Sequence, residues 1–152
     1  MASWGEFEAG APDVAAMGRR LLFPDGTGEA FLTTVAGAAG LPRTHPINIG
    51  IVGDRLVAFL LQSPKATDLA SDARFALHAH QARNAPHEFL LRGRAMAIDD
   101  PETRAQAAAA WYFEISDQYR LFEFGIEHAV LGERGSPDDW PPRYTSWRST
   151  AA

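Results

Sequence analysis

The sequence contains no cysteine and only one lysine. The absence of cysteine excludes disulfide scaffolds, thiolate metal sites and cysteine nucleophiles. No apolar run approaches the length of a transmembrane helix. The first residues, Met1–Glu6, have neither the basic start nor the apolar stretch of a secretory signal. We therefore expect a cytoplasmic protein that has no membrane partner.

Basic residues are outnumbered by acidic ones. Fourteen Lys and Arg against nineteen Asp and Glu give a formal net charge of -5. Nucleic-acid binding needs a basic face that displaces counterions, so we expect no nucleic-acid partner. Two catalytic patterns are missing as well. There is no Gly-x-Ser-x-Gly elbow, and Gly26-Thr27-Gly28 lacks the third glycine and the following apolar helix of a dinucleotide-binding fingerprint.

The length of 152 residues and the 46% hydrophobic content suit one domain with its own core. Runs of β-branched and aromatic residues predict strands at Ala30–Val35, Arg43–Ile51, Leu56–Leu61, Arg74–His80, Glu88–Ile98 and Tyr119–Val130. Proline and capping signals predict helices at Pro12–Leu22, at Ser63–Ala70 and from Asp100 to about Asp117. Gly93 predicts a bulge or a close backbone approach, and Pro46 predicts a sheet edge or a bulge. The class is mostly β with peripheral helices.

The lone lysine lies where a buried strand gives way to a helix, in Leu61–Thr67. Ser63 suits the N-cap, Pro64 the first helical position, and Lys65 the second. The start of a helix carries unpaired N–H groups and the positive end of the helix dipole, which disfavours a cation there unless an anion binds in front of it. An ordinary cap beside a solvated lysine has the same spacing, so the spacing alone leaves both interpretations open.

Five blocks of the sequence, in this order and spacing, resemble the pyridoxamine 5'-phosphate oxidase-like, FMN-binding split-barrel family. They are Ala30–Val35 (AFLTTV), Gly40–Pro46 (GLPRTHP), Ser63–Leu69 (SPKATDL), Asp72–His78 (DARFALH) and Glu88–Ala95 (EFLLRGRA). The resemblance implies a six-stranded antiparallel split β-barrel of Greek-key type. It also implies a single domain over residues 1–152, with a core at about 12–132 and a C-terminal tail, 133–152, that packs on the barrel or on a dimer partner.

The same resemblance implies a homodimer with two cofactor sites at the subunit interface. Carried over by position, Lys65 and Ser63 are candidates for binding the FMN phosphate. Residues beside the flavin ring are Thr44, His45 and Pro46, largely through their backbone groups, while Phe59, Leu60 and Gln62 line the ring and the ribityl chain.

The C-terminal tail departs from the named oxidase of that family, which holds its substrate with an arginine and a histidine near its end. This chain has no histidine after His128. We therefore do not expect vitamin B6 oxidase activity. Trp147 and Arg148 are instead candidates for reaching the cofactor of a neighbouring subunit.

Two further groups of residues have open roles. His78 and His80 are two residues apart on a predicted strand and so share one face. With His87 or Glu88 they suggest a zinc site only weakly, and we expect no metal. Arg92 and Arg94 also share a face, where they form either an anion-binding pair or an exposed set of salt bridges, and the second is the more usual arrangement.

The sequence thus predicts an FMN-dependent oxidoreductase in which the bound cofactor carries the redox chemistry on an unidentified small molecule. One alternative is a reductase of the same fold that uses the deazaflavin F420, whose anionic tail would need a further basic groove. Arg19, Arg20, Arg83 or Arg143 would have to supply it. Another is a barrel that binds flavin or another ligand without turnover. Haem handling, suggested only by the histidines, is a fourth possibility.

Overall fold

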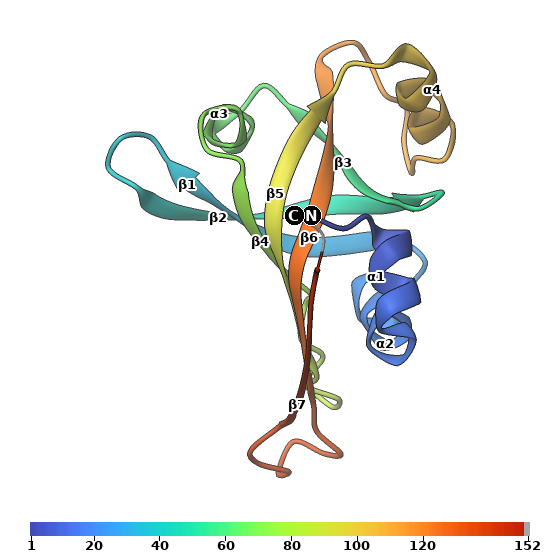
Figure 1. Ribbon diagram of the computed structural model, residues 1–152, viewed down its shortest axis with the longest axis vertical. Helices are drawn as coiled ribbons and strands as arrows, with labels where there is room; N and C mark the ends of the chain where they lie inside the picture. The colour runs from blue at the N-terminus through green and yellow to red at the C-terminus, as the bar shows by residue number, and fades with distance from the viewer. Residues whose placement is uncertain (151–152) are drawn as a thin grey trace.

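The computed structural model describes residues 1–150, in which four helices and seven strands follow one another along the chain (Figure 1). The helices are α1 (Trp4–Gly10), α2 (Pro12–Leu22), α3 (Pro64–Ser71) and α4 (Pro101–Ala109). The strands are β1 (Gly28–Ala36), β2 (Leu41–Val52), β3 (Arg55–Leu61), β4 (Arg74–His78), β5 (Glu88–Ile98), β6 (Tyr119–Glu133) and β7 (Arg143–Arg148).

The first six strands form a closed antiparallel barrel, as the sequence blocks predict. The strand order is β3-β2-β1-β4-β5-β6, and β3 closes the barrel by pairing with β6 from Val57↔Glu123 to Leu61↔Tyr119. Strands β1 to β3 follow one another through short turns, and β4 returns to lie beside β1, which is the Greek-key arrangement. Closure leaves no exposed edge within the paired region.

Strand β3 is buried on both faces, which its apolar run predicts. Leu56, Ala58 and Leu60 belong to the main core cluster, whereas the alternate residues Val57 and Phe59 belong to a second cluster under α4. A strand with two buried faces needs apolar residues at successive positions rather than at every second one. The second cluster, which includes Ala107 and Ala108, holds α4 to the outside of the barrel wall.

The predicted helix from Asp100 to about Asp117 is too long, because α4 ends at Ala109. Tertiary contacts of the next residues explain the early end. The Tyr112 hydroxyl accepts a hydrogen bond from the Gly28 N–H (3.0 Å) and donates one to the Ile49 carbonyl (2.8 Å). The Trp111 ring lies edge-on to that of Phe59, with centroids 5.0 Å apart. The chain leaves the helix where it makes these contacts.

The predicted strand Arg74–His80 is also too long, since β4 ends at His78. The backbone N–H of Ala79 still donates to the carbonyl of Phe89 (3.0 Å), so one ladder bond continues past the end of the strand. His80 lies beyond it and stacks its ring on Phe31 instead, with centroids 4.2 Å apart.

An N-terminal helix that the sequence pattern does not indicate precedes α2. Helix α1 begins with a capping box, in which the Ser3 hydroxyl accepts from the Glu6 N–H and the Glu6 carboxylate accepts from the Ser3 N–H. Its two large side chains, Trp4 and Phe7, are completely buried in the main core. Seven residues are too few to show the helical repeat that reveals longer helices.

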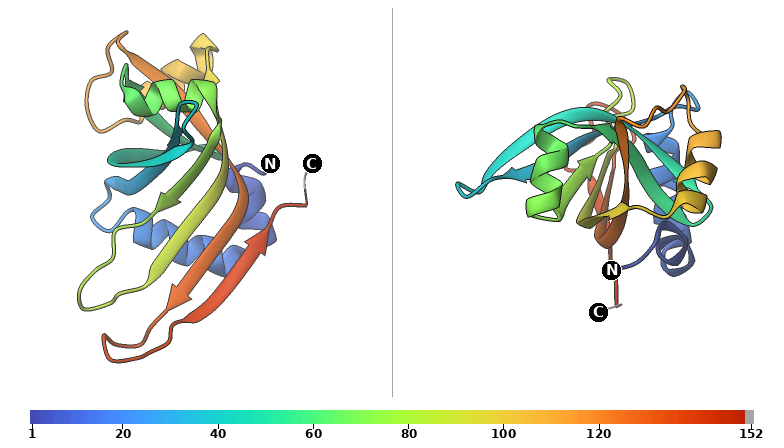
Figure 2. Two further views of the ribbon diagram at one scale, coloured as in Figure 1. Left: turned by 90° about the vertical axis from the view of Figure 1, so that its left-hand side faces the viewer. Right: turned by 90° about the horizontal axis from the view of Figure 1, so that it is seen from above.

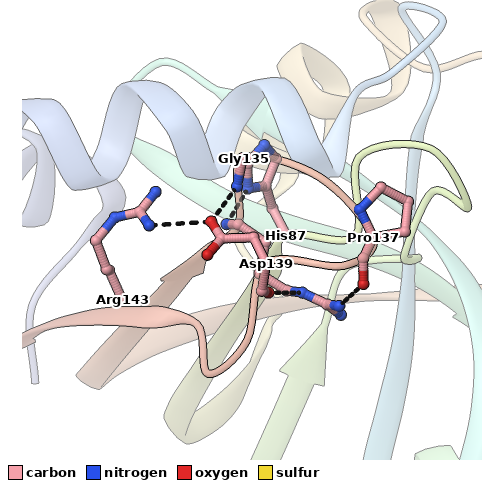
Figure 3. A network of polar contacts seen from close by, with 6 residues as sticks. His87, Gly135, Pro137, Asp139 and Arg143 are labelled. Atoms are coloured by element: carbon pink, nitrogen blue, oxygen red, sulfur yellow. Dashed lines mark hydrogen bonds and ion pairs between the residues drawn. The ribbon is translucent and has the colours of Figure 1, made fainter.

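The C-terminal tail adds β7 outside the barrel, where it pairs with residues 128–133 of β6. The loop between the two strands is fixed by polar contacts (Figure 3). Arg134 donates to the carbonyls of Asp139 (2.8 Å) and Pro137. The Asp139 carboxylate accepts from the Gly135 N–H (2.7 Å) and pairs with Arg143 (3.1 Å). The last two residues of the predicted tail, 151 and 152, lie outside the described part of the chain.

The bulge predicted at Gly93 is confirmed. The register between β5 and β6 shifts between Arg92 and Gly93. A Cβ atom on Gly93 would lie 1.9 Å from the carbonyl oxygen of Gly125 on β6. Only glycine permits this close approach of two strands.

Replacing Gly93 with alanine should therefore destabilise the barrel strongly. Because the clash is with backbone rather than with a flexible side chain, Gly93→Ala should lower the free energy of unfolding by about 3 kcal/mol, measured in urea. Gly135→Ala, in the exposed β6–β7 loop, is the control and should change it far less. Equal effects of the two substitutions would contradict the assignment of a steric limit at Gly93.

Candidate cofactor site

Helix α3 begins without a side-chain cap, which differs in detail from the expectation for Ser63. Ser63 occupies the N-cap position in extended conformation, but its hydroxyl donates to the carbonyl of Leu61 (2.9 Å) rather than accepting from the helix. Pro64 has no N–H group, so the first open donors of the helix are the N–H groups of Lys65 and Ala66. The start of α3 therefore keeps its positive end available to an anion.

The Lys65 side chain is half-buried at this helix start. Within residues 1–150 it takes part in none of the ion pairs or side-chain hydrogen bonds. The carboxylate on the same helix, that of Asp68, is already engaged elsewhere. A cation without a partner at the positive end of a helix is unfavourable in isolation, and a bound anion would remove the penalty.

A groove of about 190 Å³ lies beside Lys65. Three elements and one connection form its walls: the middle of β2, the end of β3, the start of α3 and the segment between α4 and β6. The lining residues are Pro46, Ile47, Asn48, Phe59, Leu60, Leu61, Lys65, Phe113 and Tyr119. The groove is thus mainly apolar, with one cation among its lining residues, as in many small-molecule sites.

The position of α3 depends on a buried carboxylate. Asp68, which is 5% exposed, accepts hydrogen bonds from the Thr34 hydroxyl (2.8 Å) and from Arg43 Nε (3.0 Å). Thr34 belongs to β1 and Arg43 to β2, so one carboxylate connects the helix to both strands. A buried carboxylate with its hydrogen bonds satisfied holds this helix face in one place.

Thr44, His45 and Pro46 lie on the part of β2 that has β1 on one side only, because β3 pairs with β2 at residues 50–52. The predicted edge position of Pro46 is confirmed. The Thr44 hydroxyl bonds to that of Thr33 (2.8 Å), and the Nε2 atom of His45 is buried without a partner. Backbone groups on the free edge of this segment are open to a ligand.

Four of the ten predicted site residues line the groove itself, namely Pro46, Phe59, Leu60 and Lys65. Gln62 and Ser63 are adjacent to it in the turn before α3, where Gln62 Nε2 donates to the Thr67 hydroxyl (3.4 Å). The sequence alone did not indicate Asn48, Phe113 and Tyr119 as site residues. Asn48 lies two residues after Pro46 on β2, whereas Phe113 and Tyr119 are brought to the groove only by the tertiary fold.

Trp147 and Arg148 are distant from this groove within one chain. Strand β7 lies beside β6, which also pairs with β3, but Trp147 stands opposite Ala129, ten residues along β6 from Tyr119 at the groove, a span of about 33 Å. The Trp147 ring packs instead on Phe7 of α1, with centroids 5.1 Å apart. Only a second subunit could bring these two residues to the groove.

The remaining histidines have local partners in most cases. His78 Nδ1 lies 2.6 Å from the Ala79 carbonyl, and His87 Nδ1 accepts from the Arg134 N–H (3.2 Å). The Nε2 atom of His80 is buried without a partner. Among residues 1–150 no group of three or more histidine and carboxylate side chains is arranged to hold a metal ion.

Solved structures of low sequence identity share the fold. A heme-binding protein from Mycobacterium smegmatis matches with a TM-score of 0.63 and 19% identity over 88% of this chain and 57% of its own. A NimC/NimA family protein from Clostridium acetobutylicum has a TM-score of 0.61 and 16% identity over 87% of this chain and 94% of its own. A Listeria innocua protein, provisionally described as a pyridoxamine 5'-phosphate oxidase, has a TM-score of 0.60 and 14% identity over 74% of this chain and 93% of its own.

These matches show that the chain has the split-barrel fold of the pyridoxamine 5'-phosphate oxidase-like proteins. This chain spans little more than half the length of the Mycobacterium smegmatis protein. No family model and no curated protein matches the sequence. Among the described residues, no helix is both long and apolar enough to cross a membrane.

The Asp68 contacts lead to a stability prediction. Asp68→Ala removes the acceptor of Thr34 and Arg43 and leaves a buried hydroxyl unpaired, so the free energy of unfolding in urea should fall by about 2–3 kcal/mol. Asp99→Ala, at an exposed position, is the matched control and should have little effect. A loss for Asp68→Ala no larger than for the control would show that this carboxylate does not hold α3.

Proposed function

We propose that the chain is an FMN-binding oxidoreductase whose cofactor phosphate is bound at the start of α3. The observation that supports this most is the position of the only lysine. Lys65 lies at an uncapped helix start, has no ion-pair partner in residues 1–150, and lines a mainly apolar groove. A phosphate group would accept hydrogen bonds from the open N–H groups and from the Lys65 ammonium.

The groove walls suit the flavin ring. The exposed Leu61 offers apolar surface at the end of β3, next to the largely buried Phe59 and Leu60. The free edge of β2 near Pro46 offers backbone donors and acceptors. A flavin ring has both apolar faces and a polar edge of carbonyl and N–H groups, and backbone groups of this kind bind such an edge. The side-chain amide of Asn48 already donates a hydrogen bond through Nδ2 to the Gly28 carbonyl (3.1 Å).

Bound flavin supplies hydride and single-electron transfer, so the chain itself needs no nucleophile. Its residues would bind the phosphate, orient the ring and exclude water from one ring face. This division of roles fits a sequence that lacks cysteine and the serine-hydrolase elbow. The substrate would contact the ring on the side that this chain leaves open.

We further propose that a homodimer completes the site. The groove of one chain, about 190 Å³, is smaller than the roughly 300–1,000 Å³ typical of small-molecule sites. A second copy would supply the missing wall, and Trp147 and Arg148 of that copy could then reach the cofactor. Sequence positions far from Lys65 in one chain would thereby belong to the same site.

Two contacts count against the F420 alternative. A long anionic tail needs free basic side chains, but Arg19 pairs with Glu8 (3.6 Å) and Arg143 pairs with Asp139 (3.1 Å). Of the four arginines considered for such a groove, two therefore already have carboxylate partners. FMN, whose anionic part is a single phosphate group, requires only the cation at α3.

Comparing FMN with riboflavin, which lacks the phosphate, tests the role of Lys65. Lys65→Ala should weaken FMN binding by about ten- to a hundredfold, because it removes a charge-assisted contact. The affinity for riboflavin should stay unchanged. Quenching of flavin fluorescence on titration of the ligand-free protein measures both.

Ser71→Ala, an exposed position at the far end of the same helix, is the control and should bind both flavins as the unchanged chain does. Lys65→Arg keeps the charge and should retain most of the preference for FMN. If Lys65→Ala binds FMN normally, or loses FMN and riboflavin affinity equally, the phosphate does not bind at Lys65.

A further inference from the structure

A row of paired residues crosses the sheet on its outer face. Its members, strand by strand from β2 to β7, are Thr44, Thr33, Ala76, Arg92, His128 and Arg148. Strands β4 to β7 lie side by side here, and helix α2 lies behind them, so no helix covers this part of the outer face (Figure 2). Arg92, His128 and Arg148 form a cluster in which the two guanidinium groups flank the imidazole of His128.

The central member of this cluster is buried and directly bonded. His128 is 9% exposed, and its Nδ1 atom lies 2.5 Å from Nη2 of Arg92. Because a guanidinium can only donate, Nδ1 is the acceptor and carries no proton. Burial, with the charges of Arg148 and Arg92, lowers the pKa of His128, so the ring is neutral at pH 7. The proton of the neutral ring is then on Nε2, which can donate to a ligand.

The two arginines of the cluster lack carboxylate partners in residues 1–150, whereas the neighbouring charged groups have partners. These neighbours form three pairs: Arg94 with Glu127 (3.5 Å), Arg74 with Asp72 (2.5 Å), and Glu88 with the Tyr144 hydroxyl (2.8 Å). The sequence spacing predicts one shared role for Arg92 and Arg94, but in the structure Arg92 contacts His128 whereas Arg94 pairs with Glu127. Two positive groups on either side of a buried neutral histidine destabilise a sheet when no negative group offsets their charge.

We propose that Arg92, His128 and Arg148 form a binding site for a doubly charged oxyanion, such as the phosphate group of a small metabolite. Two guanidinium charges match the charge of a phosphate monoester near pH 7. Neighbouring strands are about 4.8 Å apart, so the two arginines start about 10 Å apart and can converge over His128. The Nε2–H of His128 then donates to a third oxygen of the anion.

Within a single chain this site lies apart from the groove at Lys65, and Arg148 serves both sites only where a second copy brings it to that groove. The cluster lies on β5, β6 and β7, whereas Lys65 lies on α3, beside β2 and β3. A carboxylate is a weaker candidate, because its single charge would leave one guanidinium uncompensated. The cluster also gives Arg148 a role within its own chain.

The imidazole signals of the five histidines, recorded by nuclear magnetic resonance on the nitrogen-15-labelled protein, test this proposal. Inorganic phosphate should shift the His128 signals saturably and leave the other four unchanged, and sulfate should act similarly. Sodium chloride at equal ionic strength should produce no saturable shift, and acetate should bind far more weakly. The spectrum of His128→Gln assigns the signal.

Variants decide whether the arginines bind the anion. Arg148→Ala, which removes no hydrogen bond within residues 1–150, should weaken phosphate binding by about ten- to a hundredfold. Arg148→Lys should restore only part of it, because a guanidinium binds an oxyanion with two donors. Arg20→Ala, an exposed arginine on α2, and Lys65→Ala should bind phosphate normally. An unsaturable response, an equal response to acetate, or normal binding by Arg148→Ala would overturn the proposal.

Discussion

Pairing of β3 with β6 is the constraint on which the rest of the molecule depends. Once these strands close the barrel, β3 ends beside β6, although the next strand in the chain must pair with β1. The connection therefore crosses the end of the barrel, and α3 fills it. This route leaves the start of α3, with Lys65, next to the last residues of β3 and the free edge of β2. The candidate site is a consequence of how the barrel closes.

Much of this arrangement could be predicted from local sequence, because it depends on local chemistry. The strand runs, the Ser63-Pro64 helix start and the Gly93 bulge each follow from backbone preferences over a few residues. Local patterns could not show where α4 ends, because contacts of Tyr112 with β1 and β2 decide it. Similarly, Phe113 and Tyr119 reach the groove only through the tertiary fold.

Identical residue types in one pattern can have different partners. Arg92 and Arg94 have the same spacing from the Gly93 bulge, yet one contacts a histidine and the other a glutamate. The register of β6, shifted by one residue at that bulge, decides which side chain stands opposite each arginine. In an acidic chain, the positive groups left without carboxylates are the most informative ones. Among residues 1–150, Lys65 at the start of α3 and Arg92 and Arg148 in the row across β5 to β7 are three such groups.

The identity of a molecule that co-purifies with the chain tests the central claim most directly. The protein should be purified without added cofactor, and its absorption spectrum and the mass of any released small molecule should be determined. The account predicts a flavin spectrum and the mass of FMN, at a stoichiometry approaching one per chain. A haem spectrum, the mass of a deazaflavin, or a colourless protein that also fails to bind added FMN would contradict it.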